Sequence, residues 1–435
     1  MSPQKSDDKS AETSPLSRRD CLTWGTAAAT LGGLSSAALA APLHEKKHGR
    51  GHVHHHAHYP VAGTDPESLN GLAMAKGLAF GSCLGTAAKT PSKLASMQQF
   101  NAALAGFDDP QMRALFIAQC GILVPENELK WYTLRANPKG FDFSRADELM
   151  AFCDQYQLAM RGHTLLWNRS RWMPDWVVNH NFGATPTAEA ERMLKQHIQT
   201  VCQRYGDRIF AYDVVNETIA PPTGEMEESP FTKILGPEVI DLCFHAAREA
   251  APHAQLVYND YMSWGPKDAA HRAGVLKLLE RLKKNNVPID ALGIQAHVGS
   301  NGVGAASSLV GDADLPEWKK FLDAVTGMGL DLVITEFDVN DKYINGTLAE
   351  RDRAVADYAK AYLDIVLSYP QCRYMMAWGL SDKYSWLQHT APRPDGLPKR
   401  VLPYDDKLQP KPLREAIVQA FAAAPARPLL PMKPA

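Results

Sequence analysis

The sequence predicts an α/β fold, a single (β/α)8 TIM barrel, and three observations support this prediction. Eight short apolar runs alternate with stretches of helical spacing over about 350 residues. Barrels of this class routinely hold that many residues in one domain. Polar side chains also stand at the carboxyl ends of most runs, and a barrel brings those ends together on one face.

The eight runs are rich in apolar and β-branched residues, as buried parallel strands are. They cover residues 77–85, 121–127, 158–167, 209–217, 255–261, 291–297, 331–339 and 373–380. The stretches of helical spacing include residues 144–156, 188–206, 269–286 and 348–369. We expect Ser144 to cap the first of these helices and Gly206 to follow the second. An open doubly wound sheet is the alternative, but no GxGxxG motif opens the first helix.

The polar residues at the ends of the runs predict a shared cleft. One polar strand end is commonly the start of a loop, but seven or eight polar strand ends in one chain indicate the mouth of a barrel. Burying a carboxylate at a strand end is costly unless the group is used, so Glu217 is expected to point into this cleft. The residues concerned are Glu126, Asn127, His163, Asn216, Glu217, Asn259, Asp260, Gln295, His297, Glu336 and Trp378.

The composition excludes several classes of partner. The chain has 435 residues, 45% of them hydrophobic, and a net charge of −2. This balance supports a large core and does not mark the chain as a binder of nucleic acid or of membrane surfaces. No apolar run reaches the length of a membrane-spanning helix. We therefore expect neither nucleic acid nor a stable membrane association.

Residues 1–40 are interpreted as a twin-arginine signal peptide. Arg18 and Arg19 precede a weakly hydrophobic Ala/Gly stretch, and the small residues "ALA" precede Ala41. A chance arginine pair in a disordered tail is the alternative. The order of charge, apolar run and cleavage site favours export by the twin-arginine machinery, to the periplasm or the medium.

The remaining boundaries follow from composition. Residues 41–70 are expected to form a disordered His-rich linker, residues 71–425 the barrel domain and residues 426–435 a Pro-rich tail. Residues 44–58 contain many histidines and could bind metal. This tract has no fixed geometry that would select a metal, so a solvated linker is favoured. No metal site is expected in the barrel.

Six cysteines remain once Cys21 leaves with the signal peptide. They are widely spaced and contain no CxxC pair, so a zinc site is not expected. Twin-arginine substrates fold before export, in a reducing compartment, and most of these cysteines are therefore expected to be small buried hydrophobes. Disulfides formed after export are the open alternative. The six are Cys83, Cys120, Cys153, Cys202, Cys243 and Cys372.

Two strand ends carry a carboxylate in a distinctive context. Glu217 closes the fourth run, and Glu336 follows "DLVIT" in the seventh. The fourth and seventh strands of a barrel face each other across its mouth. Facing carboxyl groups suit glycoside hydrolysis, in which one group donates a proton to the leaving oxygen and the other, ionised, attacks the anomeric carbon.

Aromatic and amide side chains surround these positions. Indole rings pack on the apolar faces of sugars, while amide, amine and imidazole groups bond the hydroxyls. Burial in the core is an equal alternative for Trp131 and Trp264. The tryptophans in or beside the loops after strands are Trp131, Trp167, Trp172, Trp176, Trp264, Trp378 and Trp386.

Six motifs closely resemble those of glycoside hydrolase family 10, most of whose members are endo-β-1,4-xylanases. They are "ENELKW", "RGHTLLWN", "YDVVNETI", "GIQAHV", "ITEFDV" and "WGLSDKYSW". The resemblance runs from about Gly77 to Ala422 and keeps the order and spacing of the motifs. It implies a barrel and a retaining mechanism, with Glu217 as acid/base and Glu336 as nucleophile. It thus implies an endo-1,4-β-xylanase that acts on xylan or xylo-oligosaccharides and needs no cofactor.

The resemblance also implies roles in substrate binding. Asn216 would hold the 2-hydroxyl of the sugar at the cleavage point. Gln295 and His297 would flank the nucleophile, with His297 bonding Glu336 and oriented by Asp338. The full set implied is Glu126, Asn127, Lys130, His163, Trp167, Asn216, Gln295, His297, Trp378 and Trp386.

Three positions depart from the family pattern. Asn168 stands where the family usually has His, Met262 stands where Asn is common, and Trp172 is an additional aromatic residue near the cleft. None of them is one of the two glutamates. The departures therefore bear on subsite preference rather than on activity.

Other functions remain to be weighed. A silent glycan-binding barrel would be expected to lack one of the two glutamates, and both are present. A metal-dependent barrel hydrolase usually carries His-x-His on its first strand, and "AFGSCLG" has none. A barrel that acts on β-1,4-glucan differs only in its substrate, and the sequence leaves that alternative open.

Overall fold

The computed structural model describes residues 62–86, 104–299 and 313–428. The proposed signal peptide, most of the His-rich linker and the end of the Pro-rich tail lie outside these ranges. The strands are β1 (Ala79–Leu84), β2 (Ile122–Pro125), β3 (Ala159–Trp167), β4 (Ile209–Asn216), β5 (Gln255–Asp260), β6 (Ala291–Ile294), β7 (His297–Gly299), β8 (Asp331–Asn340) and β9 (Cys372–Ala377).

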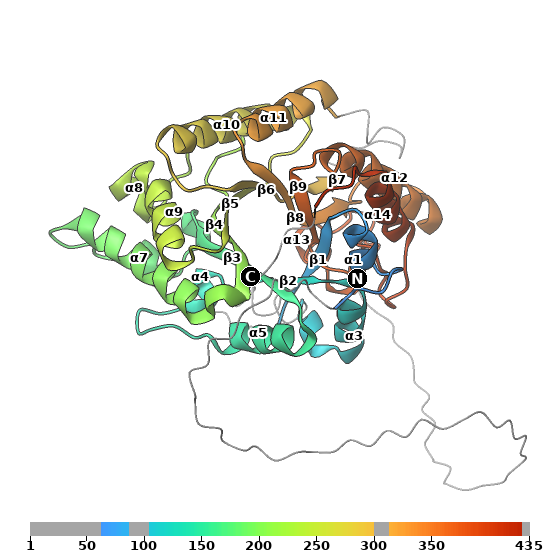
Figure 1. Cartoon of the computed structure of the whole chain (residues 1–435), viewed down its shortest axis with the longest axis horizontal. Coiled ribbons are helices and arrows are strands. Elements are labelled where there is room, and N and C mark those ends of the chain that lie inside the picture. The colour runs from blue at the N-terminus through green and yellow to red at the C-terminus, as the bar shows by residue number, and fades with distance from the viewer. Residues whose placement is uncertain (1–61, 87–103, 300–312, 429–435) are drawn as a thin grey trace, which may run out of the picture. The chain divides into compact units, whose positions relative to one another are not determined.

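Helices surround the ring of strands (Figure 1). The α-helices before β5 are α1 (Leu69–Met74), α3 (Pro110–Gln119), α4 (Trp131–Leu134), α5 (Ser144–Tyr156), α6 (Asp175–Val178), α7 (Pro186–Tyr205), α8 (Pro230–Leu235) and α9 (Glu238–Ala250). Those after it are α10 (Ala269–Lys284), α11 (Leu315–Gly327), α12 (Leu348–Val366), α13 (Leu387–Thr390) and α14 (Pro412–Ala423).

The strands close into a barrel. Each of β1 to β5 pairs in parallel with the strand that follows it. The strand β6 pairs with β8, β8 pairs with β9, and β9 returns to pair with β1. Eight parallel strands therefore form the barrel, and the predicted (β/α)8 fold is confirmed. All their carboxyl ends meet at one mouth.

One predicted strand is divided. The sequence predicts a single strand over residues 291–297, but the structure ends β6 at Ile294 and starts β7 at His297. Ala296 between them has a φ of 60°. A left-handed residue cannot continue a strand, so the chain turns there. The short strand β7 then pairs only with the outer end of β8, next to Asp338.

The helix boundaries follow local capping. Gly206 follows α7 with a φ of 54°, as predicted. Ser144 is itself the first residue of α5 and does not cap it, so that prediction is wrong by one position. Asp142 Oδ1 instead accepts the Ser144 backbone N–H at 3.0 Å, which uses one of the free donors of the first turn. Thr347 and Glu350 form a reciprocal capping box at the start of α12.

Side chains fill the barrel, so it is a packed core and not a pore. The interior cluster includes Ile122, Phe210, Val257 and Met376, and Trp378 belongs to the same cluster. A larger core lies between the outside of the strands and the helices, and it contains both Trp131 and Trp264. The core alternative is therefore correct for these two tryptophans.

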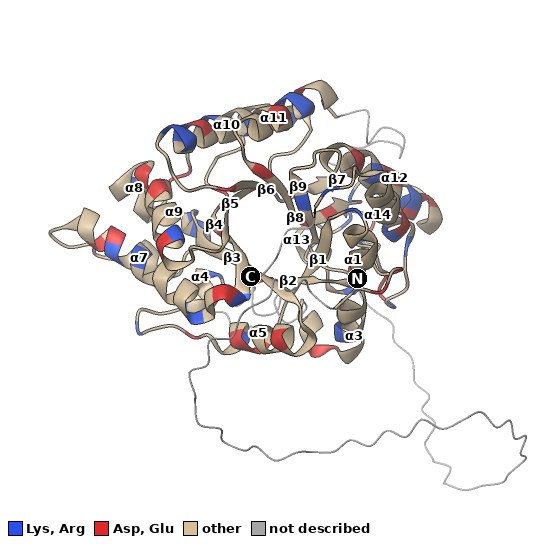
Figure 2. Ribbon diagram, viewed as in Figure 1, with Lys and Arg blue, Asp and Glu red and all other residues tan. Residues whose placement is uncertain are grey.

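Charged residues of both signs lie along the surrounding helices: Lys, Arg, Asp and Glu are distributed over all sides of the barrel (Figure 2). Within the described ranges, no helix has the length and apolar character needed to span a membrane. The six cysteines of the described ranges are all buried and free, which agrees with their interpretation as small hydrophobes.

Candidate active site

A cavity of about 920 Å³ opens at the carboxyl ends of the strands. Of the predicted cleft residues, Asn259 and Asp260 do not line it. The catalytic and substrate-binding residues implied by the family resemblance all do: Glu126, Asn127, Lys130, His163, Trp167, Asn216, Glu217, Gln295, His297, Glu336, Trp378 and Trp386. Six further residues complete the lining: Tyr132, Arg171, Trp172, Tyr261, His389 and Thr390. Because residues at or just after the ends of β2, β3, β4, β5, β6 and β9 meet here with Glu336 of β8, the cavity is the site that the polar strand ends predict.

Glu217 follows β4 and is 9% exposed. Its backbone has a φ of 52°, a left-handed conformation that few glutamates adopt. Gln295 Nε2 donates to Glu217 Oε1 at 3.0 Å. Arg169 Nε donates to the Glu217 backbone carbonyl at 3.0 Å and lies 3.7 Å from Oε2. These contacts fix both the backbone and the carboxyl group at the cavity wall.

Burial raises the pKa of Glu217 above its usual value, and the charges of Asp260 and Glu336 add to this rise. The Gln295 hydrogen bond and the Arg169 charge oppose the rise without cancelling it. A carboxyl group of this kind favours its protonated form and is suited to donate a proton.

Glu336, on β8, is 4% exposed. Asn259 Nδ2 donates to its Oε1 at 2.7 Å. His297 Nε2 lies 3.2 Å from its Oε2, and His163 Nδ1 lies 3.9 Å from its Oε1. Burial alone would raise the pKa of Glu336, but the charges of His163, His297 and Lys130 and the His297 hydrogen bond outweigh it and hold that pKa at about 2. The carboxylate is therefore ionised and available as a nucleophile.

His297 bridges two carboxylates. Its Nδ1 lies 2.9 Å from Asp338 Oδ2, opposite the contact with Glu336. Burial lowers the pKa of His297, but Asp338 and Glu336 outweigh that effect and raise it to about 10. The ring is thus an imidazolium that donates from both nitrogens. Trp386 Nε1 donates to the same Asp338 oxygen at 2.8 Å, which links an aromatic wall of the cavity to the nucleophile.

Asn259 connects the two glutamates. Its Nδ2 donates to Asn216 Oδ1 at 2.9 Å as well as to Glu336, and Thr335 Oγ1 donates to its Oδ1 at 2.7 Å. Gln295 Nε2 lies 3.3 Å from the same Asn216 oxygen and also bonds Glu217. The sequence predicts Asn259 in the cleft as a polar strand end; the structure places it outside the lining, where it bonds Asn216 and Glu336.

The cavity has a charged side as well as an aromatic one. Lys130 Nζ lies 4.8 Å from the Trp167 ring centroid and 5.7 Å from that of Trp378. It also donates to Asn127 Oδ1 at 3.2 Å. Burial lowers the pKa of Lys130, and burial raises the pKa of Glu126 nearby. A close cation between indole rings can bond hydroxyls while the rings pack on a sugar face.

His163 is held by charge within the barrel. The Oδ2 atom of Asp213 on β4 lies 2.9 Å from His163 Nδ1. Asp213 also forms a buried ion pair with Arg161 on β3. These contacts inside the barrel fix the orientation of the imidazole that lines the cavity.

Two of the three departures from the family pattern lie outside the cavity lining. Asn168 is buried and bonds Thr218 and Ser229, each at 2.7 Å, which fixes the chain just after Glu217. Met262 is fully buried in the core. Only Trp172 lines the cavity, where it stacks on Trp167 with a centroid distance of 4.6 Å and an interplanar angle of 20°.

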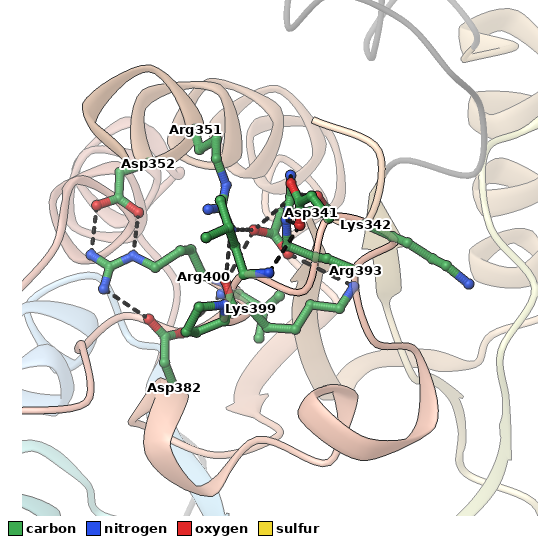
Figure 3. A network of polar contacts seen from close by, with 12 residues as sticks. Asp341, Lys342, Arg351, Asp352, Asp382, Arg393, Lys399 and Arg400 are labelled. Atoms are coloured by element: carbon green, nitrogen blue, oxygen red, sulfur yellow. Dashed lines mark hydrogen bonds and ion pairs between the residues drawn. The ribbon is translucent and has the colours of Figure 1, made fainter. Parts of the chain in front are cut away.

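The loop between β9 and α14 carries Trp386, His389 and Thr390 to the cavity. No sequence signal marks His389 or Thr390, because they lie on the short helix α13 rather than at a strand end. A network of ion pairs connects this loop to the end of β8 and to α12 (Figure 3). The ion network consists of Asp341, Arg351, Asp352, Asp382, Arg393, Lys399 and Arg400.

Asp341 is the centre of that network and is fully buried. Two cations approach Asp341 Oδ2: Arg351 Nη2 at 2.6 Å and Arg393 Nη1 at 3.6 Å. A third, Lys399 Nζ, lies 3.8 Å from Asp341 Oδ1. The Arg400 backbone N–H donates to the same carboxylate at 3.2 Å. Three cations and one amide on two segments thus share one buried anion, which fixes the loop that carries Trp386.

Two buried carboxyl groups with oppositely shifted pKa values, in an aromatic cavity at the mouth of a (β/α)8 barrel, define a glycoside hydrolase. The family model for glycosyl hydrolase family 10 matches residues 83–420. The chain therefore belongs to glycosyl hydrolase family 10.

Known relatives agree with this assignment. The chain is 33% identical over 309 residues to endo-1,4-beta-xylanase 3 of Hypocrea jecorina (strain QM6a), a match that covers 70% of this chain and 76% of the relative. It is 33% identical over 290 residues to endo-1,4-beta-xylanase A of Caldicellulosiruptor sp. (strain Rt8B.4), covering 62% of this chain but only 39% of that longer protein.

Solved structures show the same fold. Native xylanase 10B from Thermotoga maritima superposes with a TM-score of 0.68 at 26% identity, covering 82% of this chain and 98% of that chain. Xylanase 10B from Thermotoga petrophila RKU-1, in complex with xylobiose, superposes with a TM-score of 0.67 at 26% identity, covering 82% and 97%.

Proposed function

We propose that the chain is an endo-1,4-β-xylanase that hydrolyses internal β-1,4-xylosidic bonds of xylan with retention of configuration. The observation that carries the proposal is the pair Glu217 and Glu336, which line one cavity with pKa values shifted in opposite directions. Relatives named as endo-1,4-beta-xylanases, and one such enzyme solved with xylobiose, supply the substrate class.

The reaction takes two steps. Protonated Glu217 gives its proton to the glycosidic oxygen as the bond to the anomeric carbon breaks, and Glu336 attacks that carbon to form a covalent glycosyl ester. Glu217, now ionised, then removes a proton from water, which attacks the same carbon and releases Glu336. His297 keeps Glu336 ionised before it attacks and stabilises the carboxylate that hydrolysis of the ester releases, and no cofactor is needed.

The other lining residues are assigned to substrate binding. Asn216 bonds the 2-hydroxyl at the cleavage point, because Asn259 and Gln295 orient its amide beside both glutamates. Gln295 and His297 flank the nucleophile. The remaining residues proposed to bind sugar rings and hydroxyls are Glu126, Asn127, Lys130, His163, Trp167, Trp378 and Trp386.

Xylan is preferred over β-1,4-glucan in this proposal. A xylose unit lacks the exocyclic CH₂OH group of glucose, so a cavity closely walled by Trp378 and Trp386 can exclude glucan by steric clash. The glucan-active barrel and the silent glycan-binding barrel are the competing assignments.

Reducing ends released from xylan and from carboxymethylcellulose test the proposal, with Glu336→Ala as the inactive control. We expect many reducing ends from xylan and few from carboxymethylcellulose. Because cleavage is internal, the viscosity of the xylan solution should also fall rapidly. Equal rates on both polymers would favour the glucan assignment. No release from either polymer, with retained binding, would favour the silent barrel.

We further propose that the protein is exported through the twin-arginine machinery to the periplasm or the medium. The support is the Arg18-Arg19 pair before a weak apolar stretch and a small-residue cleavage site. Replacing both arginines with lysine should retain the enzyme in the cytoplasm, as fractionation would show. Unimpaired export of the double variant would count against this route.

A further inference from the structure

The cations that line the cavity differ in their surroundings. His297 lies between Asp338 and Glu336, and Lys130 bonds Asn127. Arg171 lines the same cavity and is exposed. Among the residues that the structure describes, no carboxylate forms an ion pair with Arg171. Lys130 bonds a neutral amide but is buried among the charges of Glu336, Glu126 and Glu217. Among the described lining residues, Arg171 therefore combines an exposed charge with no ion pair to a carboxylate.

The turn that carries Arg171 is well defined. Trp172 N donates to the Arg169 carbonyl at 3.0 Å, and Met173 N to the Ser170 carbonyl at 3.2 Å. Ser170 Oγ donates to the Glu228 carbonyl at 3.3 Å. These bonds hold the segment after β3 in a tight turn, so that the Arg171 side chain is presented at the cavity.

Aromatic packing orients the guanidinium group. The Arg171 Cζ atom lies 5.0 Å from the Trp172 ring centroid, and Trp172 stacks on Trp167. A guanidinium held on an indole keeps its N–H donors free at its edge. The nearby Arg169 is used differently, because it bonds the Glu217 backbone and Tyr261.

The chemistry of this arrangement fits a carboxylate attached to a sugar. Guanidinium binds carboxylate through two parallel hydrogen bonds, and an indole beside it packs on a pyranose face. Three carboxyl groups, Glu126, Glu217 and Glu336, also line the cavity, so an anionic ligand needs a nearby cation. Neutral xylose units do not need such a cation.

We propose that Arg171 recognises the carboxylate of a uronic acid branch on the xylan backbone, so that the enzyme favours acidic over neutral xylan. This inference rests on the proposed xylanase function. It adds a specificity-determining residue that lies outside the two-glutamate machinery and is supplied by the same segment as the additional Trp172.

Two matched substrates test it: a linear xylo-oligosaccharide and the same chain carrying one glucuronic acid branch. The values of kcat/KM are measured for the wild type, Arg171→Gln and Arg171→Lys. In Arg171→Gln, kcat/KM for the acidic substrate should fall about three- to ten-fold more than kcat/KM for the neutral substrate, as expected for an exposed charge-assisted pair. Arg171→Lys should retain part of the preference, because lysine keeps the charge without the two-pronged geometry.

Two controls identify the interaction. The branched substrate with its carboxyl group methyl-esterified should lose its advantage on the wild type, and raising the salt from about 0.01 M to about 1 M should reduce the preference for the free acid. Arg145→Gln, which changes an exposed arginine paired with Glu148 on α5, should leave both rates unchanged.

The outcomes separate the two proposals. If the wild type cleaves neither oligosaccharide, the proposed function fails. If it cleaves the neutral oligosaccharide but Arg171→Gln changes both rates by the same factor, or if the methyl ester keeps the full advantage of the acid, the recognition of a uronic acid branch by Arg171 is wrong.

Discussion

The Nε2 atom of His297 lies 3.2 Å from Oε2 of Glu336, and the imidazolium ring offers its other N–H to Asp338. The charges of His163, His297 and Lys130, together with the His297 hydrogen bond, outweigh burial and hold the pKa of the nucleophile low. Of these groups, His297 has a pKa raised to about 10, so it stays positively charged over most of the pH range. Because Trp386 donates to the same Asp338 oxygen, a ligand that moves the Trp386 indole also moves the partner of His297.

Replacing His297 with Gln should shift the acidic limb of the pH–rate profile. Glu336 must be ionised to attack, so activity falls as the pH drops through its pKa, which is about 2 in the wild type. Loss of the imidazolium should raise this pKa, and therefore the acidic limb, by about 1 to 2 pH units. The measurement is kcat/KM against pH on an aryl xylobioside. The alkaline limb, set by Glu217, is the internal control, and an unmoved acidic limb would show that His297 does not control the charge of Glu336.

Replacing Glu217 with Ala should separate the two chemical steps. Proton donation matters most for poor leaving groups, so xylan hydrolysis should fall by about 10²- to 10⁴-fold. An aryl glycoside with an acidic phenol should still form the covalent intermediate. Azide needs no general base, so it should accelerate turnover and give a β-glycosyl azide. Absence of azide rescue, or an azide product of inverted configuration, would reject the acid/base assignment.

Glu336 should carry the sugar in the intermediate. A 2-fluoro xylobioside with a good leaving group should inactivate the wild type, because the fluorine slows breakdown of the glycosyl ester. Peptide mass mapping should then place the label on Glu336. The Glu336→Ala variant should lose activity on every substrate and gain no retained product with azide. A label on any other residue would overturn the assignment.

Replacing Asp341 with Asn should destabilise the folded protein. The change leaves the buried cations Arg351, Arg393 and Lys399 without their shared anion, which should cost about 3 to 5 kcal/mol in free energy of unfolding. Urea unfolding measures this loss. The matched control is Glu191→Gln, which breaks the exposed pair with Lys195 and should cost no more than about 1 kcal/mol. Equal stability of the two variants would mean that the ion network does not hold the loop.

The positions of the barrel strands could be predicted because buried parallel strands are short apolar runs with a fixed relation to the mouth of the barrel. The same relation places Glu217, Glu336 and the other strand-end residues near the mouth of the barrel from the sequence alone. The division between β6 and β7 could not be predicted, because nothing in the composition of residues 291–297 shows that Ala296 adopts a left-handed conformation.

Other features depend on contacts between distant segments. His389 and Thr390 lie on a loop whose Arg393 and Lys399 bind Asp341, more than 50 residues earlier in the chain, and no local pattern in the sequence predicts that contact. The opposite pKa shifts of Glu217 and Glu336 also need the structure, since both residues are almost fully buried and their neighbours decide the direction. Sequence position alone distinguishes them only through the family resemblance.

The left-handed backbone at Glu217 has a consequence for engineering the enzyme. An L-residue other than glycine pays roughly 1 to 2 kcal/mol in this conformation, and burial of an ionisable group adds to the penalty. Glu217→Gly would relieve this backbone strain, at the loss of the Gln295 hydrogen bond and of the acid/base carboxyl group, so a variant that gains stability here loses xylan hydrolysis. A thermostability screen on this enzyme needs to score sugar release in the same round, or its best survivors will be inert barrels.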